Sequence, residues 1–384
     1  MPPFPSGAAM RGDSVVSALV PVLGSRGYRI EVVTAAGDPK ATATLSIQVL
    51  PGADVDNAAG KWQRLGGELL LGWRAGRRIT RGGPAAALIS SPAFLSAMLV
   101  TGWCRVKRVP YVLEVRDVYP QVYAHAGLLR ETSLAYRLLL ALSKSMYRHA
   151  LRIVAATEGL RSTVAPLAGD VSVSCVYNGY PAALLRLRPA KHERFTLCFH
   201  GVLGFFQDVE SVYALAQALH PHDIDVVVIG YGRKESVLTA RAQPNLRFLG
   251  RLPFERTMAE AARCHVGLCL RMDDAISRDA FPIKVWEYLG LGMPSIVTPV
   301  CEAGDFIERR GCGVQLPAGD VDALVRTARS MRDDPAQFAA MRGRCDAAAE
   351  GFTRERLGAD VARLVGATLD DASTGRTSVR AEDA

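Results

Sequence analysis

The sequence predicts an α/β protein of two doubly wound, Rossmann-like domains, each with a parallel sheet between layers of helices. The chain has 384 residues, of which 49% are apolar, and this is enough for two hydrophobic cores. Short β-branched or aliphatic runs alternate with helical stretches along its whole length, which is the pattern of parallel sheets. Residues 178–194 are rich in proline and basic residues and show no strand pattern, so they are predicted to link the two halves.

The strands are predicted from short apolar runs that lie between turn residues. In the first half these runs are residues 28–34, 87–90, 111–115, 153–156 and 171–176. In the second half they are residues 195–199, 224–229, 246–249, 266–270, 295–298 and 314–316. Residues 352–369 are predicted to form the last helix. Residues 370–384, rich in Ser, Thr, Gly and charge, are predicted to be disordered.

The most informative segment is residues 278–299, which reads R-D-A-F-P-I-K-V-W-E-Y-L-G-L-G-M-P-S-I-V-T-P. Pro282 is predicted in the first turn of a helix that ends near Gly290 and Gly292. Because no Ser, Thr, Asp or Asn stands directly before Pro282, no side chain is predicted to cap this helix. Its first backbone N–H groups are therefore available to an anion such as phosphate.

Lys284 and Glu287 stand three residues apart, which places them on one face of the predicted helix. One interpretation gives the Lys284 ammonium to a diphosphate and the Glu287 carboxylate to a ribose diol. The alternative is a surface ion pair on an ordinary helix, and such pairs contribute little to stability. Spacing alone favours the alternative.

Segment 278–299 resembles the donor-site signature of glycosyltransferase family 4, in the bacterial subgroup that builds cell-surface polysaccharides. Other segments resemble the same subgroup in the same order along most of the chain. They are P-P-F-P-S-G-A-A-M-R at 2–11, S-P at 91–92, V-R-D-V-Y-P at 115–120, Y-N-G at 177–179, F-H-G-V-L-G at 199–204, G-Y-G at 230–232 and F-L-G-R-L-P at 248–253.

The resemblance implies the GT-B fold, in which two domains face each other across a cleft. It implies an N-terminal acceptor-binding domain, residues 1–182, joined by the crossover helix at about 352–369. A C-terminal nucleotide-sugar-binding domain would then span residues 183–351, with residues 370–384 as the tail. The implied reaction moves a hexose or amino-hexose from a nucleoside-diphosphate sugar, a UDP-sugar first, to a lipid-linked or saccharide acceptor, with retention of configuration.

The resemblance also implies a set of donor-binding residues. Family members carry an Arg and a Lys shortly after the strand that opens the second domain, whereas this chain has G-V-L-G-F-F-Q-D at 201–208. Lys284 and Arg278 are therefore expected to supply the charge on the diphosphate, and Lys284→Ala is expected to be more damaging than Gln207→Ala. Asp279 stands where the family's E-x7-E element has its first glutamate. The remaining expected donor contacts are Gly7, Gly201, Gly204, Gln207, Gly230, Gly250, Arg251, Leu252, Phe281, Pro282 and Glu287.

Catalytic groups on the acceptor side are predicted at the carboxyl end of strand 111–115. Arg116 and Asp117 follow that strand directly, at the usual ligand edge of a parallel sheet. Asp117 is expected to orient or deprotonate the acceptor hydroxyl, and Arg116 to hold substrate charge. The alternative is a buried Arg–Asp pair that fixes the loop. With Lys284 and Glu287, these residues complete the expected catalytic set.

The N-terminus departs from the family, whose members begin with an apolar strand before the proline-rich loop. Here Pro2 follows Met1 directly, so the first strand of the N-terminal domain is apparently missing. Loss of a central buried strand would cost much of a domain's stability, and a natural start upstream of Met1 is expected. The alternative is a rearranged first domain.

The net charge of +8 and the pI near 9.2 suit an anionic partner, and lipid and phosphate rank before nucleic acid because no nucleic-acid module is recognisable. Residues 92–108 and 133–152 combine apolar helices with basic ends, as interfacial helices do, although both also suit a domain core. The eight cysteines show no C-x-x-C spacing and indicate a reduced, cytoplasmic protein. No metal or other cofactor is expected, because helix dipoles and basic side chains can neutralise a leaving diphosphate. We expect a cytoplasmic protein with peripheral contact to an anionic membrane.

Two other function classes stay open at this point. One is an isomerase with the same two-domain fold, such as a nucleotide-sugar 2-epimerase, although the K-x-x-E-Y and V-R-D-V-Y-P segments favour transfer. The other is an inactive scaffold or membrane-associated subunit, which the missing first strand and the missing Arg and Lys would favour.

Overall fold

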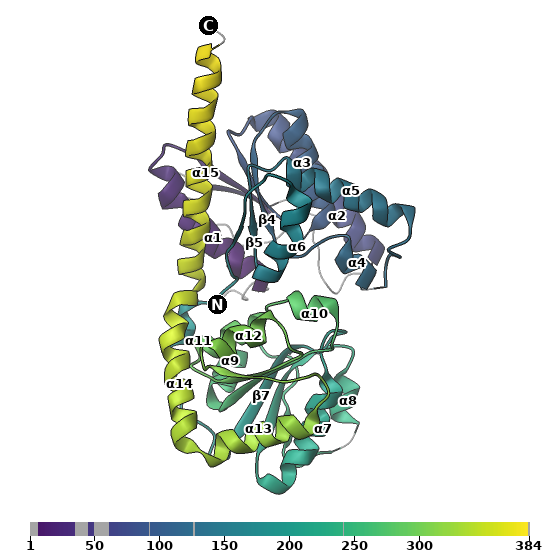
Figure 1. The fold of residues 1–384 in the computed structure, drawn as a ribbon, viewed down its shortest axis with the longest axis vertical. Coiled ribbons are helices and arrows are strands. Elements are labelled where there is room, and N and C mark those ends of the chain that lie inside the picture. Colours follow the sequence, from purple (N-terminus) through teal and green to yellow (C-terminus); the bar gives the residue numbers. More distant parts are fainter. Residues whose placement is uncertain are drawn as a thin grey trace. The chain divides into compact units, whose positions relative to one another are not determined.

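The computed structural model describes residues 7–34, 45–49, 61–91, 93–125, 127–240 and 242–382 (Figure 1). The chain divides into two compact units. We call the unit of Pro5–Tyr177 and Leu357–Ala384 the N-terminal domain, and the unit that contains Asn178–Arg356 the C-terminal domain. The proline-rich segment 2–6 lies outside the described residues.

Parallel strands and helices alternate in the N-terminal domain. The strands are β1 (Ile30–Thr34), β2 (Leu45–Val49), β3 (Ala87–Ser90), β4 (Tyr111–Val115), β5 (Arg152–Ala155) and β6 (Val173–Cys175). The helices are α1 (Gly7–Gly24), α2 (Lys61–Gly82), α3 (Phe94–Val106), α4 (Gln121–His125), α5 (Leu134–Arg148) and α6 (Glu158–Ala168). Strands β3, β4, β5 and β6 form one parallel sheet in that order, and β1 pairs with β2 in a separate parallel pair.

Helices cover both faces of the β3–β6 sheet (Figure 1). Helices α3, α5 and α6 lie on one side of β4 and β5, and α1 and α15 (Arg354–Glu382) lie on the other. Residues of α3, α5, α6, β4 and β5 share one hydrophobic cluster that contains Phe94, Leu113, Met146, Ile153 and Val164. A parallel sheet buried on both faces requires such continuous apolar strands, and all five residues of β4 are buried.

The last helix joins the N-terminal domain from Leu357 on. Its buried residues include Val361 and Val365, four apart on one face. Arg26 forms an ion pair of 3.0 Å with Asp370 of this helix. The structure differs from the sequence prediction beyond this point, because α15 continues to Glu382 through the segment predicted to be disordered. Once the packed part of a helix has formed, each further residue adds one backbone hydrogen bond, so polar residues can extend it.

The C-terminal domain is a second α/β unit. Its strands are β7 (Thr196–Val202), β8 (Asp225–Tyr231), β9 (Leu246–Phe248), β10 (Val266–Leu270), β11 (Ser295–Thr298) and β12 (Gly313–Gln315). Its helices are α7 (Val209–Leu219), α8 (Glu235–Thr239), α9 (Phe254–Arg263), α10 (Ala275–Asp279), α11 (Ile283–Gly290), α12 (Glu302–Arg309), α13 (Val321–Asp333) and α14 (Pro335–Ala349). Short 3-10 turns occur at Ala182–Arg186, His220–His222 and Glu350–Phe352.

The strand order of the C-terminal sheet is β12-β11-β10-β7-β8-β9, and every pair is parallel. Counted from β7, this is the order 6-5-4-1-2-3 of a doubly wound sheet. The core of this domain includes Leu197, Leu215, Val228 and Leu268, all fully buried. The order in which the strands are added reverses between β7 and β10, which are neighbours in the sheet. The candidate site lies at this point.

Candidate functional site

The carboxyl ends of β7 and β10 lie side by side at the point where the strand order of the C-terminal sheet reverses. Ligands of open α/β sheets bind outside the strands at such a point. His200 and Gly201 stand near the end of β7, and Arg271 follows the last residue of β10. The topology therefore selects this edge as the candidate site.

Lys284 reaches this edge from the first turn of α11. The structure places Pro282 at the N-cap, one residue before the position predicted for it, and no side chain caps the helix, as predicted. The side chain of Lys284 is buried, with the residue 8% exposed, and its Nζ donates a hydrogen bond of 2.9 Å to Oε1 of Gln207. The same Nζ lies 3.8 Å from the centroid of the Phe199 ring. Burial lowers the pKa of Lys284 to about 8.

Gly201 lies beside Lys284 at the end of β7. Its φ of +122° lies in a region that residues with a Cβ rarely adopt. A Cβ at this position would stand 3.7 Å from Cε of Lys284. The ammonium therefore lies directly beside the backbone of the strand end.

Three basic residues lie near Gln207, two of them in contact with its backbone. Nζ of Lys234 donates to the backbone carbonyl of Gln207 at 2.9 Å and forms an ion pair of 2.8 Å with Glu210. Arg271 makes a β-bridge with Gln207, and its Nε donates to Oγ of Ser277 at 3.1 Å. Lys284, Lys234 and Arg271 thus gather around the residue that stands where family 4 members carry their Arg and Lys. This gathering suits a doubly charged anion.

Glu287 lies one helical turn after Lys284 and is also buried, with 6% of the residue exposed. Its Oε2 lies 3.5 Å from Nε2 of His200. Burial and the nearby Lys284 lower the pKa of His200 to about 3, so its imidazole is neutral at neutral pH. Burial raises the pKa of Glu287 to about 7. Because Lys284 and Glu287 are both buried, they are not the surface ion pair of the alternative interpretation.

The predicted glycines pack the strand ends against each other. A Cβ on Gly230 would lie 2.0 Å from the carbonyl oxygen of Gly201, and the N–H of Gly230 donates to the carbonyl of Gly250 at 2.9 Å. The carbonyl of Gly204 accepts a hydrogen bond of 3.2 Å from the N–H of Gln207. Gly230 and Gly204 therefore shape the backbone around Gly201 and Gln207.

Several other predicted site residues make contacts away from Lys284. Arg278 is exposed and pairs with Asp273 at 2.9 Å. The guanidinium of Arg251 lies 4.4 Å from the centroid of the Tyr231 ring. The carbonyl of Leu252 accepts a hydrogen bond from the Thr257 hydroxyl.

Phe281 supports α11 from inside the domain. Its ring is buried and stacks on Trp286 with 4.0 Å between centroids. Asp279 is the last residue of α10, and its side chain lies outside the described part of the structure. Gly7 is the first residue of α1 in the N-terminal domain, where a loop had been predicted.

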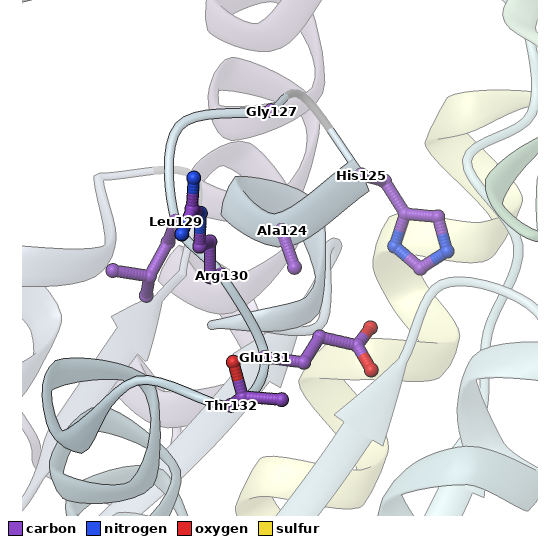
Figure 2. Close-up of a pocket in the computed structure, with 7 residues that line it drawn as sticks. All are labelled: Ala124, His125, Gly127, Leu129, Arg130, Glu131 and Thr132. Atoms are coloured by element: carbon purple, nitrogen blue, oxygen red, sulfur yellow. The ribbon is translucent and has the colours of Figure 1, made fainter.

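Arg116 and Asp117 follow β4 in the N-terminal domain, as predicted. The backbone N–H of Arg116 donates to Oγ of Ser91 at 3.1 Å. Asp117 is exposed, which does not fit the alternative of a buried Arg–Asp pair. The chain then forms α4. The end of α4 and the residues after it line a shallow pocket of about 460 Å³. Figure 2 shows His125 and Glu131 toward one side of this pocket and Leu129 and Arg130 toward the other.

Three site residues were missed by the sequence analysis: Arg271, Lys234 and His200. Arg271 directly follows the strand predicted at 266–270, and this is the same signal that selected Arg116. His200 lies in the quoted F-H-G-V-L-G segment, but nothing in the sequence signalled its contact with Glu287. Lys234 had no signal, since its contact with Gln207 depends on how two loops pack.

Comparison with known proteins shows which proteins the chain resembles. Residues 195–334 match the model of the family Glycosyl transferases group 1. The chain is also 26% identical over 234 residues to the probable glycosyltransferase WbjE of Pseudomonas aeruginosa. That match covers 56% of this chain and 58% of WbjE, so the chain aligns with less than two thirds of its curated relative.

Solved structures show the same fold. HepE of Anabaena, in complex with UDP and glucose, aligns with a TM-score of 0.68 and 13% identity over 96% of this chain and 98% of HepE. WaaG, a glycosyltransferase involved in lipopolysaccharide biosynthesis, aligns with a TM-score of 0.61 and 14% identity over 94% of this chain and 96% of WaaG. The predicted fold class is confirmed, since these two parallel-sheet domains have the GT-B fold. The match to the Glycosyl transferases group 1 model lies within the C-terminal domain.

Proposed function

We propose that this chain is a glycosyltransferase that moves a hexose or amino-hexose from a UDP-sugar to a lipid-linked or saccharide acceptor in cell-surface polysaccharide biosynthesis. The observation that carries the proposal is the buried Lys284 ammonium beside Gln207 and Arg271, at the β7–β10 switch point. UDP bound to HepE, and the role of WaaG in lipopolysaccharide biosynthesis, support the donor and the pathway.

In the proposed donor complex, the diphosphate takes the place of the Gln207 amide oxygen as the acceptor for Lys284. Arg271 and the first backbone N–H groups of α11 add further positive charge. The Glu287 carboxylate accepts hydrogen bonds from the ribose diol. The backbone around Gly250 and Leu252 binds the nucleobase. We propose that these groups, and not a metal ion, neutralise the leaving diphosphate.

The acceptor is proposed to bind to the N-terminal domain near Asp117, with the pocket of Figure 2 beside α4 as part of its site. In a retaining front-face transfer, the bond from the sugar C1 to the diphosphate oxygen breaks. A bond from C1 to the acceptor oxygen forms on the same face. The acceptor proton moves to the leaving diphosphate, so Asp117 orients the hydroxyl and does not need to keep the proton.

The acceptor class also suggests where the protein works. No helix in the described ranges is long and apolar enough to cross a membrane. We propose a cytoplasmic protein that contacts an anionic membrane peripherally, because the net charge of +8 favours an acidic surface and a lipid-linked acceptor lies in one.

UDP release tests the proposed function. The purified full chain is incubated with individual UDP-sugars, with and without a membrane extract that contains acceptor lipids. We expect UDP release that depends on the extract and is lost in Lys284→Ala. Conversion of the UDP-sugar into an epimer without UDP release would show an isomerase. Absence of both reactions, with UDP-sugar binding also absent, would show an inactive scaffold.

A further inference from the structure

Helix α5 presents an apolar face to the solvent. Leu134, Leu138 and Leu142 stand four residues apart along one face and are 82%, 61% and 37% exposed. Ala135 and Ala141 are exposed as well. The buried residues of α5 are Ser143, Met146 and Tyr147, near the end of the helix. Helix α5 therefore packs on the core through another face and leaves these leucines outside the core.

Helix α3 behaves differently, although its sequence looked similar. It buries Phe94, Leu95, Ala97 and Cys104, among others, in the N-terminal core. Helix α3 is therefore a core helix with a basic end, as the domain-core interpretation of this segment predicted. Only the segment that became α5 keeps the properties of an interfacial helix.

Basic residues accompany the apolar face of α5. The helix contains Arg137, Lys144 and Arg148 and no acidic residue. Nη1 of Arg105, in the last turn of α3, donates to Oγ of Ser145 at 2.7 Å, and this brings the basic end of α3 onto α5. Ser145 follows Leu142 by three residues, so the row of leucines leads directly to this cation.

A basic hollow lies at the same end of the two helices. It has a volume of about 730 Å³, and its lining includes Arg105, Arg108 and His149. Val106, between the two arginines, is exposed. The hollow therefore offers positive charge beside apolar surface, which is the combination that an anionic lipid headgroup with its acyl chains requires.

A second copy of this chain is a poorer occupant of the α5 face. A contact between two α5 helices through the leucines would gather Arg137, Lys144 and Arg148 of both copies at one interface. To this interface α5 contributes no acidic residue, and the segment just before the helix contributes only Glu131. A bilayer with acidic lipids covers the leucines and neutralises the cations at once.

We propose that the exposed face of α5, together with the basic end of α3, is the surface with which this chain docks on an anionic lipid bilayer. The inference rests on the proposed function for the reason why the chain would dock, since a lipid-linked acceptor lies in a membrane. Leu134 follows Thr132 of the Figure 2 pocket by two residues. Docking through α5 would thus hold the proposed acceptor pocket at the lipid surface.

Vesicle co-sedimentation of the full chain tests the docking surface. The vesicles contain either equal parts of phosphatidylcholine and phosphatidylglycerol or phosphatidylcholine alone. We expect binding to the anionic vesicles only. Leu134→Ser with Leu138→Ser, and separately Arg137→Glu with Lys144→Glu, should each weaken it by about tenfold or more.

Two matched controls use other exposed residues. Leu65→Ser with Leu69→Ser removes two exposed leucines from α2, and Arg326→Glu with Arg329→Glu reverses two exposed charges on α13. Both should bind anionic vesicles like the unchanged chain. Thermal unfolding verifies that each variant is folded, and only folded variants are scored. If an α5 change proves unfolded, the single substitution Leu134→Ser replaces it.

Three outcomes would overturn the docking surface. They are unchanged binding of both α5 variants, equal loss in the α2 control, and a dimer that disappears on Leu134→Ser with Leu138→Ser while vesicles are not bound. The measurement uses no sugar donor, so it is separate from the test of activity. Vesicle binding without UDP release from any UDP-sugar would overturn the proposed function and leave the docking surface intact.

Discussion

The ammonium of Lys284 donates a hydrogen bond of 2.9 Å to the amide oxygen of Gln207. A phosphate oxygen that enters the site can replace this amide oxygen without moving Lys284. Gln207 therefore holds Lys284 in place before the donor binds, whereas a basic residue at position 207 would repel the lysine. Under the proposed function, this contact stands in for the Arg and Lys that family 4 members carry after the first strand of the domain.

Lys284→Ala should weaken binding of UDP by about tenfold or more, because hydrogen bonds to a charged group contribute about 1.5–3 kcal/mol. Gln207→Ala should weaken it by less than about threefold, since the lysine remains over the Phe199 ring. Calorimetric titration with UDP measures both variants. Arg326→Ala, on the exposed face of α13, is the control and should bind UDP normally. A larger loss in Gln207→Ala than in Lys284→Ala would contradict the role given to the lysine.

Arg271 should matter more for donor binding than Arg278, although the sequence analysis favoured Arg278. The guanidinium of Arg271 acts electrostatically on Lys284, whose pKa is lowered by burial and also by this guanidinium, whereas Arg278 is exposed and paired with Asp273. We expect Arg271→Gln to raise the KM for the UDP-sugar by about tenfold and Arg278→Gln to change it by less than about twofold. Steady-state kinetics over a range of donor concentrations gives both values, and the opposite order would restore the original assignment.

Most of the strands could be predicted from the sequence, and the strand that was missed has a physical reason. The strands 87–90, 111–115, 266–270 and 295–298 were predicted with their observed bounds, because each is a short run with adjacent apolar residues, many of them aliphatic or β-branched. Strand β2 was missed, because Leu45, Ile47 and Val49 alternate with polar residues. No two apolar residues are adjacent within this strand, so it does not form an apolar run.

Some residues of the candidate site could also be predicted from the sequence, and others could not. Lys284 and Gln207 came from a motif and its departure from the family, and the structure brings them together. No family motif marks Arg271. Its position directly after strand 266–270 was the available signal, and its place beside β7 follows only from the strand order. The exposed leucines of α5 required the packing of a whole domain, since α3 has a similar composition and is buried.

Donor binding should depend on pH on both sides of neutrality. Glu287, with a pKa of about 7, is charged above that pH, and Lys284, with a pKa of about 8, is charged below that pH. Affinity for a UDP-sugar should therefore fall below pH 7, as the carboxylate is protonated, and above pH 8, as the ammonium loses its proton. UDP-glucose is the suitable ligand, because its esterified diphosphate has no group that titrates near neutral pH.

Two substitutions assign the two sides of this profile. Glu287→Gln should remove the decrease on the acidic side, because glutamine does not titrate. Lys284→Arg should remove the decrease on the alkaline side, since a guanidinium stays charged. Fluorescence or calorimetric titrations from about pH 6 to about pH 9 measure each profile. If the affinity of the unsubstituted protein for UDP-glucose did not change across this pH range, neither group would titrate in the free site.

Gly230 should be far less tolerant of a methyl group than Gly250. In Gly230→Ala the new Cβ would meet the carbonyl oxygen of Gly201 at 2.0 Å, and both residues are held in the β7–β8 ladder. We expect a loss of about 3 kcal/mol or more in the free energy of unfolding. In Gly250→Ala the new Cβ has no atom within 4 Å, and only the φ of +64° is unfavourable for alanine. The free energy of unfolding should therefore fall by about 1–2 kcal/mol. Urea unfolding compares the two, and equal losses would contradict the close packing of β7 on β8.

Asp117 should affect turnover and leave donor binding unchanged. It lies exposed after β4 in the N-terminal domain, whereas the Lys284 site belongs to the C-terminal domain. Asp117→Asn keeps the size of the side chain and removes the charge that would orient an acceptor hydroxyl. We expect kcat to fall by about 100-fold, within the range of a positioned acid or base, with the affinity for UDP within about twofold of the unchanged chain. Asp170→Asn, an exposed aspartate after α6, is the control and should be fully active. A weaker affinity for UDP in Asp117→Asn would instead connect this residue to the donor and remove it from the acceptor side.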